Sequence, residues 1–337
     1  MDTYAALSKL SIARMVSERH RRQASEIALT PYRVGAGETL LVEGEDDDTM
    51  MLVCEGELEV LVGDPPMRVA TITEGRLLGE MALFSKHGRR SATVRTLTPC
   101  KLLLLDRGNL EVLRQLGNAL VPMLESTALR SLGRRLREVD ALIASLAEGQ
   151  PLQAPDPGML SRLMDLFKTK APEPPPPAPP DPVAILRAAP SFAGLDARGV
   201  TALAQLLTPM PVTAGQEITR EGIVDEGAFV VASGQVDVFR ETAPERHARI
   251  AVLGPGSLFG TVSLVHGRVR SATCIAEKPG WLLKVPRGLY DQLSEASTLP
   301  AQVLRRAVYD SLSEQLTMAN RTLSQLRSTA LNARRPG

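Results

Sequence analysis

Two segments of the sequence place a glycine, a short helix-forming stretch and an arginine in the same order. In the first, Gly79 is followed by Glu80–Phe84, and Arg90 comes 11 residues after the glycine. A guanidinium can donate two hydrogen bonds to one phosphate, and a glycine turn lets backbone N–H groups converge on an anion. Glu80 needs another role beside a phosphate, and acidic residues in dinucleotide folds accept a hydrogen bond from ribose. The segment therefore indicates a site for phosphate joined to ribose.

The second segment keeps Gly260 and Arg270 but has Thr261 at the position of the glutamate, and Ser271 follows the arginine. Threonine is shorter and uncharged, so it cannot reach or orient a ribose hydroxyl as glutamate does. We expect this second site to be weakened, altered or vestigial. Binding through the arginine and the backbone amides remains the open alternative.

These segments belong to an internal duplication. The sequence R-S-A-T occurs at 90–93 and again at 270–273, 180 positions later. Before each copy stands an alternating strand pattern with a central glycine, at 50–62 and at 228–239. Such repetition predicts two copies of one domain.

Each copy ends in a helical pattern with a heptad seam, and the two seams are again offset by 180. Apolar residues three and four apart are typical of a two-stranded coiled coil. The helices could pair with each other or with those of a second chain, or each could cover its own β domain. The seams consist of Leu129, Leu132, Leu136, Val139, Ile143 and Leu146, and of Tyr309, Leu312, Leu316, Ala319, Leu323 and Leu326.

The run Gly79-Glu80-Met81-Ala82-Leu83, a six-residue spacer and Arg90-Ser91-Ala92 resembles the phosphate-binding cassette of the cyclic nucleotide-binding domain family. The spacer has the length found in the bacterial catabolite activator, and the resemblance covers roughly 26–148 and 187–328. It implies an α+β fold of two tandem jelly-roll-like β-rolls, each followed by a long helix. The expected division is a helical lead-in (1–25), a first domain (26–148), a proline-rich linker (149–182), a second domain (183–332) and a tail (333–337).

The resemblance also implies roles for residues. Glu80 would accept from the ribose 2′-hydroxyl, while Arg90 and the amides near Ala82 and Leu83 would hold the cyclic phosphate. Ser91 would add a hydroxyl contact. The expected ligand is cAMP or cGMP, with no cofactor or metal. The ligand residues expected at the first site are Gly79, Glu80, Met81, Ala82, Leu83, Arg90 and Ser91, and those of the weaker site are Gly260, Thr261, Arg270 and Ser271.

The base is less defined by the sequence. In the catabolite activator an R-R-L run on the following helix precedes a Thr-Ser pair that touches adenine, and here Arg134-Arg135-Leu136 precedes Val139-Asp140. An ionised Asp140 could accept from guanine N1–H and could not favour the acceptor N1 of adenine. A solvated aspartate beside a helix seam is the alternative, so cAMP and cGMP both stay open.

Composition excludes several function classes. Lys plus Arg total 39 and Asp plus Glu total 38, so no global field favours nucleic acid or an anionic membrane. The 3 cysteines and 4 histidines show no metal-ligand or disulfide spacing. No signal peptide or run of 18 apolar residues is present, so we expect a cytoplasmic protein without a membrane span.

Neither catalysis nor direct DNA binding is expected. No kinase glycine loop or nucleophile elbow occurs, and only about ten residues follow Leu326, with no helix-turn-helix. The leading hypothesis is a sensor in which ligand at the first site repositions the helix 119–147 and signals to another protein. The competing hypothesis is a scaffold whose nucleotide pockets are relics.

Two further segments allow other partners. The tandem arrangement resembles regulatory subunits of cyclic nucleotide-dependent kinases, and Arg21-Arg22-Gln23-Ala24 matches an inhibitory R-R-x-A pattern, although a basic helix end explains it adequately. The linker holds 11 of the 25 prolines between Pro151 and Pro182, and the run 174–180 predicts polyproline II. An apolar stripe at 159–167 could dock on a partner or fold back onto a domain.

Overall fold

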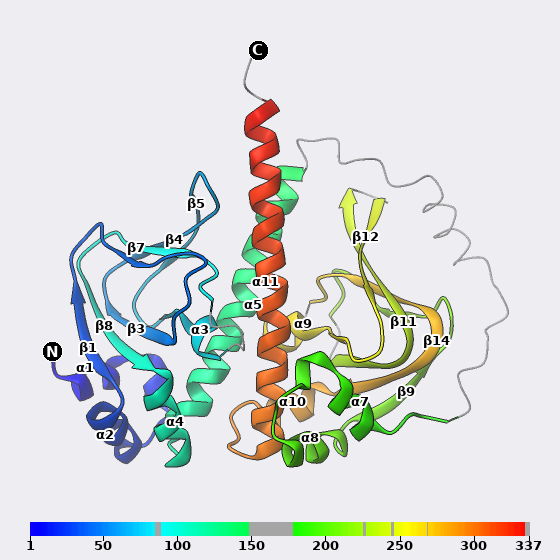
Figure 1. Ribbon diagram of the computed structural model, residues 1–337, viewed down its shortest axis with the longest axis horizontal. Coiled ribbons are helices and arrows are strands. Elements are labelled where there is room, and N and C mark those ends of the chain that lie inside the picture. The colour runs from blue at the N-terminus through cyan, green and yellow to red at the C-terminus, as the bar shows by residue number, and fades with distance from the viewer. Residues whose placement is uncertain (85–88, 148–177, 225–226, 244–245, 268, 334–337) are drawn as a thin grey trace. The chain divides into compact units, whose positions relative to one another are not determined.

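The computed structural model describes residues 1–84, 89–147, 178–224, 227–243, 246–267 and 269–333. Its contacts divide the chain into two compact units, each containing one copy of the predicted β domain (Figure 1). Unit 1 takes its described residues from 1–139, 294–297 and 312–325, and unit 2 takes its own from 140–293, 298–311 and 326–333. Each unit is described separately below.

Unit 1 is built on two antiparallel sheets that enclose one core. The first has the strand order β1-β8-β3-β6 and the second β2-β7-β4-β5. Alternating apolar residues place one face of each strand inside, where Val53, Leu58 and Leu102 are fully buried. The strands are β1 (Thr30–Val34), β2 (Thr39–Leu41), β3 (Thr49–Glu55), β4 (Leu58–Val62), β5 (Met67–Ile72), β6 (Leu77–Leu78), β7 (Thr93–Thr96) and β8 (Cys100–Asp106).

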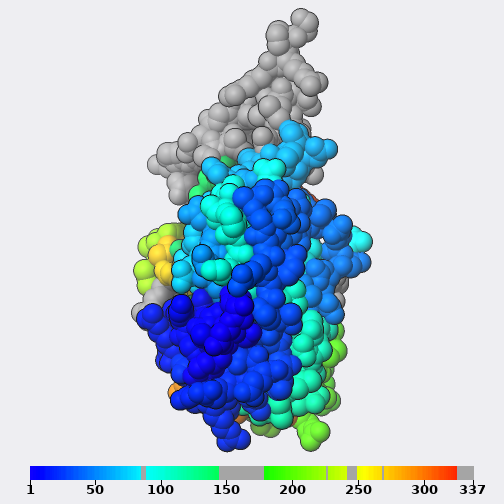
Figure 2. All heavy atoms as spheres, turned by 90° about the vertical axis from the view of Figure 1, so that its left-hand side faces the viewer, coloured from blue at the N-terminus to red at the C-terminus, as the bar shows by residue number. Residues whose placement is uncertain are grey.

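Helices precede the first strand of this β-roll and follow its last strand. The first two helices form the dark blue layer below the strands in Figure 2. Asp2 and Ser17 cap them by accepting from backbone N–H groups, and Asp106 caps α4 through the N–H of Asn109. The helices are α1 (Thr3–Lys9), η1 (Ser11–Ala13), α2 (Glu18–Ile27), α3 (Glu80–Phe84), α4 (Arg107–Gln115) and α5 (Leu120–Ala147).

Unit 2 repeats this plan with longer strands. In unit 1 the chain breaks between β3 and β4 near Gly56, whereas β11 continues through Gly234 and β14 continues as one strand. Both glycines have positive φ, a conformation that other residues adopt at a cost. The elements are α7 (Pro182–Ala188), η2 (Pro190–Phe192), α8 (Ala197–Ala204), β9 (Thr208–Val212), β10 (Glu217–Thr219), β11 (Ala228–Ala243), β12 (Arg246–Leu253), β13 (Leu258–Phe259), α9 (Thr261–Val265), β14 (Thr273–Val285), α10 (Arg287–Leu293) and α11 (Leu299–Ala333).

The predicted fold class is confirmed: two tandem β-rolls, each followed by a long helix. The seam residues from Leu129 to Val139 and from Tyr309 to Leu316 are buried, but burial alone does not identify a pairing partner. Helix pairing therefore stays a prediction, as do the domain limits. The linker stripe 159–167 and the first part of the polyproline run, 174–177, lie outside the described residues, and α7 begins at Pro182.

Two other expectations meet the structure here. Arg21 and Arg22 lie on α2 and Ala24 is fully buried, so this segment is helical and not free to enter a partner's groove. No helix in the described part of the chain is long and apolar enough to cross a membrane.

The core predicts a large difference between two leucines of unit 1. Leu102 is fully buried in the centre of β8, and replacing it with alanine should cost about 2–5 kcal/mol of unfolding free energy because a cavity remains. Leu97 is 38% exposed, and Leu97→Ala is the matched control, expected to change stability by less than about 1 kcal/mol. Urea denaturation measures both. Equal losses would contradict the assigned core.

Candidate functional site

A pocket lies in unit 1 between the β-roll, α3 and α5. Its apolar wall comes from both sheets, and its polar groups come from the cassette and from α5. A few convergent polar groups in an apolar concavity are typical of a small-molecule site. The lining residues are Leu41, Val60, Ile72, Leu78, Gly79, Glu80, Met81, Ala82, Arg90, Ser91, Ala92, Val94 and Arg135.

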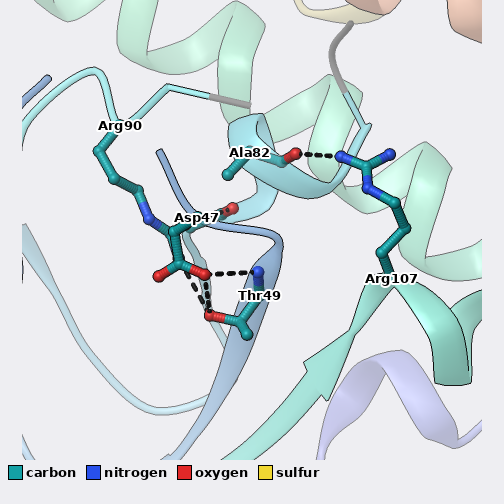
Figure 3. A network of polar contacts seen from close by, with 6 residues as sticks. Asp47, Thr49, Ala82, Arg90 and Arg107 are labelled. Atoms are coloured by element: carbon teal, nitrogen blue, oxygen red, sulfur yellow. Dashed lines mark hydrogen bonds and ion pairs between the residues drawn. The ribbon is translucent and has the colours of Figure 1, made fainter. Parts of the chain in front are cut away.

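Arg90 is one of two arginines among the lining residues and is only 4% exposed. Its Nη1 donates to Gly79 O at 2.8 Å and its Nη2 to Thr49 Oγ1 at 3.0 Å. The same Nη2 lies 2.5 Å from Asp47 Oδ2, and Figure 3 shows these groups together. Since a buried charge is tolerated only when it is paired and hydrogen-bonded, these contacts hold the guanidinium in place.

Asp47 is in turn held by Thr49, whose N–H and hydroxyl both donate to Asp47 Oδ1, at 2.8 and 2.9 Å. Partial burial opposes the charged carboxylate, but the hydrogen bonds from Arg90 and Thr49 outweigh burial and keep the pKa of Asp47 below its usual range. At neutral pH the carboxylate is therefore ionised and balances the guanidinium.

Gly79 makes room for this arrangement. Its φ is +75°, and a Cβ there would overlap Arg90 Nη1 and come within 2.9 Å of Thr49 O. Any larger residue would both strain the backbone and displace the arginine. The position of the Arg90 side chain thus requires a glycine at residue 79, 11 residues earlier.

Glu80 begins α3 and is 1% exposed. Arg135 of α5 balances its charge, with Nη1 3.0 Å from Glu80 Oε1, and Arg135 Nη2 also donates to Leu77 O at 3.1 Å. Neither carboxylate oxygen receives a hydrogen bond of good geometry from the described residues. A buried carboxylate in a pocket wall, charge-balanced but short of donors, is suited to accept from a ligand hydroxyl.

The structure brings most of the predicted first-site residues together. Gly79, Glu80, Met81, Ala82, Arg90 and Ser91 all line the pocket. Leu83 lies in α3 and is buried, but it is not among the lining residues.

Asp140 is also absent from the lining; it belongs to unit 2, where its carboxylate accepts from Arg240 Nη2 at 2.9 Å. That hydrogen bond raises the pKa of Arg240. Arg240 Nε also donates to Ser271 O at 3.3 Å. Asp140 is therefore engaged by an arginine of unit 2, and its role in reading a base stays a prediction.

Sequence reasoning gave no role to Asn320, which lies in the α11 part of unit 1. Its Nδ2 donates to Ser91 O at 3.4 Å, the residue is 8% exposed, and its Oδ1 has no hydrogen-bond partner among the described residues. The 180-residue repeat contained a signal for it, because Asn320 stands 180 positions after Asp140.

A family model with the description "Cyclic nucleotide-binding domain" matches residues 31–115 and 209–297, one stretch in each β-roll. The chain belongs to the cyclic nucleotide-binding domain family. The matched stretches hold both cassettes, with Arg90 and Arg270 at corresponding places.

Similar proteins include two nematode kinases. The chain is 26% identical over 249 residues to the cGMP-dependent protein kinase egl-4 of Caenorhabditis briggsae and 27% identical to that of Caenorhabditis elegans. The match covers 74% of this chain but only about a quarter of either kinase. Among solved structures, the regulatory domain of Toxoplasma gondii PKA with cAMP is 17% identical, with a TM-score of 0.31, covering 86% of this chain and 90% of that one.

The second cyclic nucleotide-binding domain holds its arginine differently. Arg270 is 3% exposed, and its Nη1 donates to Gly227 O at 2.7 Å, to Ser263 Oγ at 2.8 Å and to Gly260 O at 3.3 Å. Its guanidinium also lies 5.6 Å from the centre of the Phe229 ring. Thr261 is buried at the start of α9, and Ser271 is partly buried.

The Asp47–Arg90 pair predicts a pH-dependent term in stability. Because the folded-state pKa of Asp47 is lowered, the pair stabilises the fold above the unfolded-state pKa, and this contribution disappears as pH falls through the folded-state value. Asp47→Asn should lower the unfolding free energy by about 1–3 kcal/mol at pH 7. The gap to the wild type should narrow as pH falls below the unfolded-state pKa.

Urea denaturation from pH 7 to pH 3 measures this gap. Asp46→Asn is the matched control, since Asp46 pairs with Arg89 on the surface, with side chains 76% and 71% exposed, and should have little effect. A gap that stays constant down to pH 3 would show that the Asp47 charge does not stabilise the fold.

Proposed function

We propose that this chain is a non-enzymatic sensor whose first domain binds a cyclic nucleotide, cAMP or cGMP, and reports it to another protein. The observation that carries the proposal is that one pocket is lined by both a buried arginine, Arg90, and a buried glutamate, Glu80, whose carboxylate lacks hydrogen-bond donors among the described residues. Their charges fit a ligand that carries an anionic phosphate and a neutral hydroxyl donor.

Arg90 is the proposed phosphate ligand. Its guanidinium is already oriented by Gly79 O and Thr49 Oγ1, so little side-chain freedom is lost on binding. Arg90 Nε has no partner among the described residues and can donate to the ligand. Ser91, next in sequence and also in the lining, supplies a further hydroxyl.

Glu80 is the proposed ribose ligand. Arg135 Nη1 lies 3.0 Å from Glu80 Oε1, and a carboxylate accepts stronger hydrogen bonds than a neutral group. Because Arg135 belongs to α5, the ribose-binding residue is tied directly to the helix that follows the β-roll. This tie supports a role for α5 in reporting occupancy.

The base is the least restrained part of the ligand. Asn320 lies next to Ser91 and is not itself a lining residue, and an amide that both donates and accepts does not select adenine over guanine. The nematode relatives are named cGMP-dependent kinases, while the Toxoplasma structure holds cAMP. We therefore propose a purine cyclic nucleotide without choosing between the two.

The second domain is proposed to be altered. Thr261 supplies no carboxylate for a ribose. Arg270 is held by two carbonyls and a serine hydroxyl, much as Arg90 is held in the first cassette, so the proposed change concerns the ribose contact. The expected stoichiometry is one nucleotide per chain.

A thermal-shift screen with cAMP, cGMP and a cyclic dinucleotide tests the proposal. One of the mononucleotides should raise the Tm, and Arg90→Ala should weaken binding by roughly ten to over a hundredfold in calorimetry, because a charged hydrogen-bond donor is lost. Arg89→Ala is the matched control: its side chain is 71% exposed and should be dispensable.

Two outcomes would contradict the sensor. If no nucleotide shifts the Tm, the chain is the scaffold with relic pockets. If Arg90→Ala, shown to be folded by its own unfolding transition, binds as tightly as the wild type, the phosphate lies elsewhere.

The Glu80 assignment makes a separate prediction about the sugar. The wild type should bind a cyclic nucleotide about tenfold or more tightly than its 2′-deoxy analogue, since the missing hydroxyl leaves the carboxylate short of a donor. Glu80→Gln should reduce this ratio. Calorimetric titration of both ligands into both proteins gives the comparison, and an unchanged ratio would remove Glu80 from the site.

A further inference from the structure

Arg107 joins three parts of unit 1. It is the first residue of α4, and its Nη2 donates to Ala82 O in the cassette helix at 2.6 Å, as Figure 3 shows. Its backbone N–H donates to Asp48 O at 3.0 Å. Asp48 follows Asp47, the carboxylate that holds Arg90. Arg107 thus contacts both the cassette and the loop whose Asp47 holds Arg90, and it is itself the start of α4.

The same link occurs in the second copy. Arg287 stands 180 positions after Arg107 and is the first residue of α10. Its Nη1 donates to Leu264 O at 2.7 Å and to Ser263 O at 3.3 Å, within the second cassette helix. The second cassette has lost the glutamate but kept this arginine. The link therefore belongs to the cassette backbone and does not depend on the carboxylate.

The partners of the two arginines differ in one respect. Arg287 also pairs with Asp291, whose Oδ1 lies 2.9 Å from Arg287 Nε. In the part of the chain that the structure describes, no carboxylate lies within ion-pair distance of the Arg107 guanidinium, whose side-chain hydrogen bond goes to Ala82 O. Arg107 is thus committed to the cassette peptide, whereas Arg287 is shared.

A hydrogen bond to Ala82 O fixes more than one atom. The peptide group is planar and trans, so holding the carbonyl of Ala82 also fixes the direction of the Leu83 N–H. In a helix the N–H groups point towards the N-terminal end, and in α3 that end is formed by Gly79 and Glu80, which line the pocket. A charged donor on the carbonyl also polarises the peptide and strengthens its N–H as a donor.

We propose that Arg107 is a positioning residue for the nucleotide: it sets the orientation of the cassette backbone and carries the occupancy of the pocket to α4. This inference rests on the proposed function of the first domain. A ligand that binds the cassette acts on Ala82 and hence on the first residue of α4, the helix that leads into α5. The residue touches no expected ligand atom and acts through the peptide it holds.

The test compares Arg107→Gln with Arg287→Gln in the full chain. Arg107→Gln should bind the mononucleotide found in the screen about tenfold more weakly, with the Tm of the nucleotide-free protein changed little. Arg287→Gln breaks the equivalent bond in the other copy and should leave this affinity unchanged. Arg107→Lys keeps the charge and a donor and should recover part of the loss.

Amide NMR supplies a readout that a merely structural role would not move. In the wild type, nucleotide should shift the α4 amide of Leu113, which is fully buried, and in Arg107→Gln that shift should be lost even at saturating ligand. Wild-type affinity together with a wild-type Leu113 shift in Arg107→Gln would overturn the proposal. If Arg107→Gln is unfolded, Arg107→Met decides, since it keeps the apolar stem but has no donor, and an unaltered affinity and shift there would also overturn the proposal. Absence of nucleotide binding by the wild type would instead refute the proposed function.

Discussion

The burial of one guanidinium organises the first domain. Arg90 is almost fully enclosed, and a charge in that position must be matched by acceptors from every side. Asp47 supplies the countercharge, Thr49 orients it, and Gly79 leaves space for the side chain while offering its carbonyl. Three separate segments of sequence are thereby held to one point, and the pocket is the space that remains beside it.

The sequence predicted this domain well because its chemistry is local. The glycine, the glutamate and the arginine lie within 12 residues, and alternating apolar strands can be read without knowledge of their partners. The repeat strengthened the fold prediction, since the same order of landmarks occurs twice with an offset of 180 residues. What the sequence could not give was the set of groups that arrive from a distance. Asp47, Arg135 and Arg107 each reach the cassette from another element. Nothing in the local sequence of Asp47 or Arg107 distinguishes them from surface residues, and the R-R-L run that contains Arg135 did not show that it meets Glu80.

Asp140 is the converse case, a residue that the local sequence singled out without showing its neighbours. Its place after an R-R-L run on a helix made it a reasonable candidate for base recognition, but a position on a helix does not say which neighbour the side chain meets. In the structure an arginine takes the carboxylate, and Asn320, the residue at the equivalent position in the repeat, lies beside Ser91. The sequence shows that Asp140 and Asn320 hold equivalent positions on their helices. Which groups each side chain contacts could be seen only in the structure.

The duplication within one chain has a genetic consequence. A protein assembled from two identical subunits carries every substitution twice, so a change that suits one site is imposed on the other. Here the two cassettes are encoded separately, and each can be altered alone. The second copy has Thr261 where the first has Glu80, and Arg287 pairs with Asp291 while Arg107 donates to Ala82 O. Joining the copies in one polypeptide thus lets the two cassettes carry different residues at the same position, as Glu80 and Thr261 do.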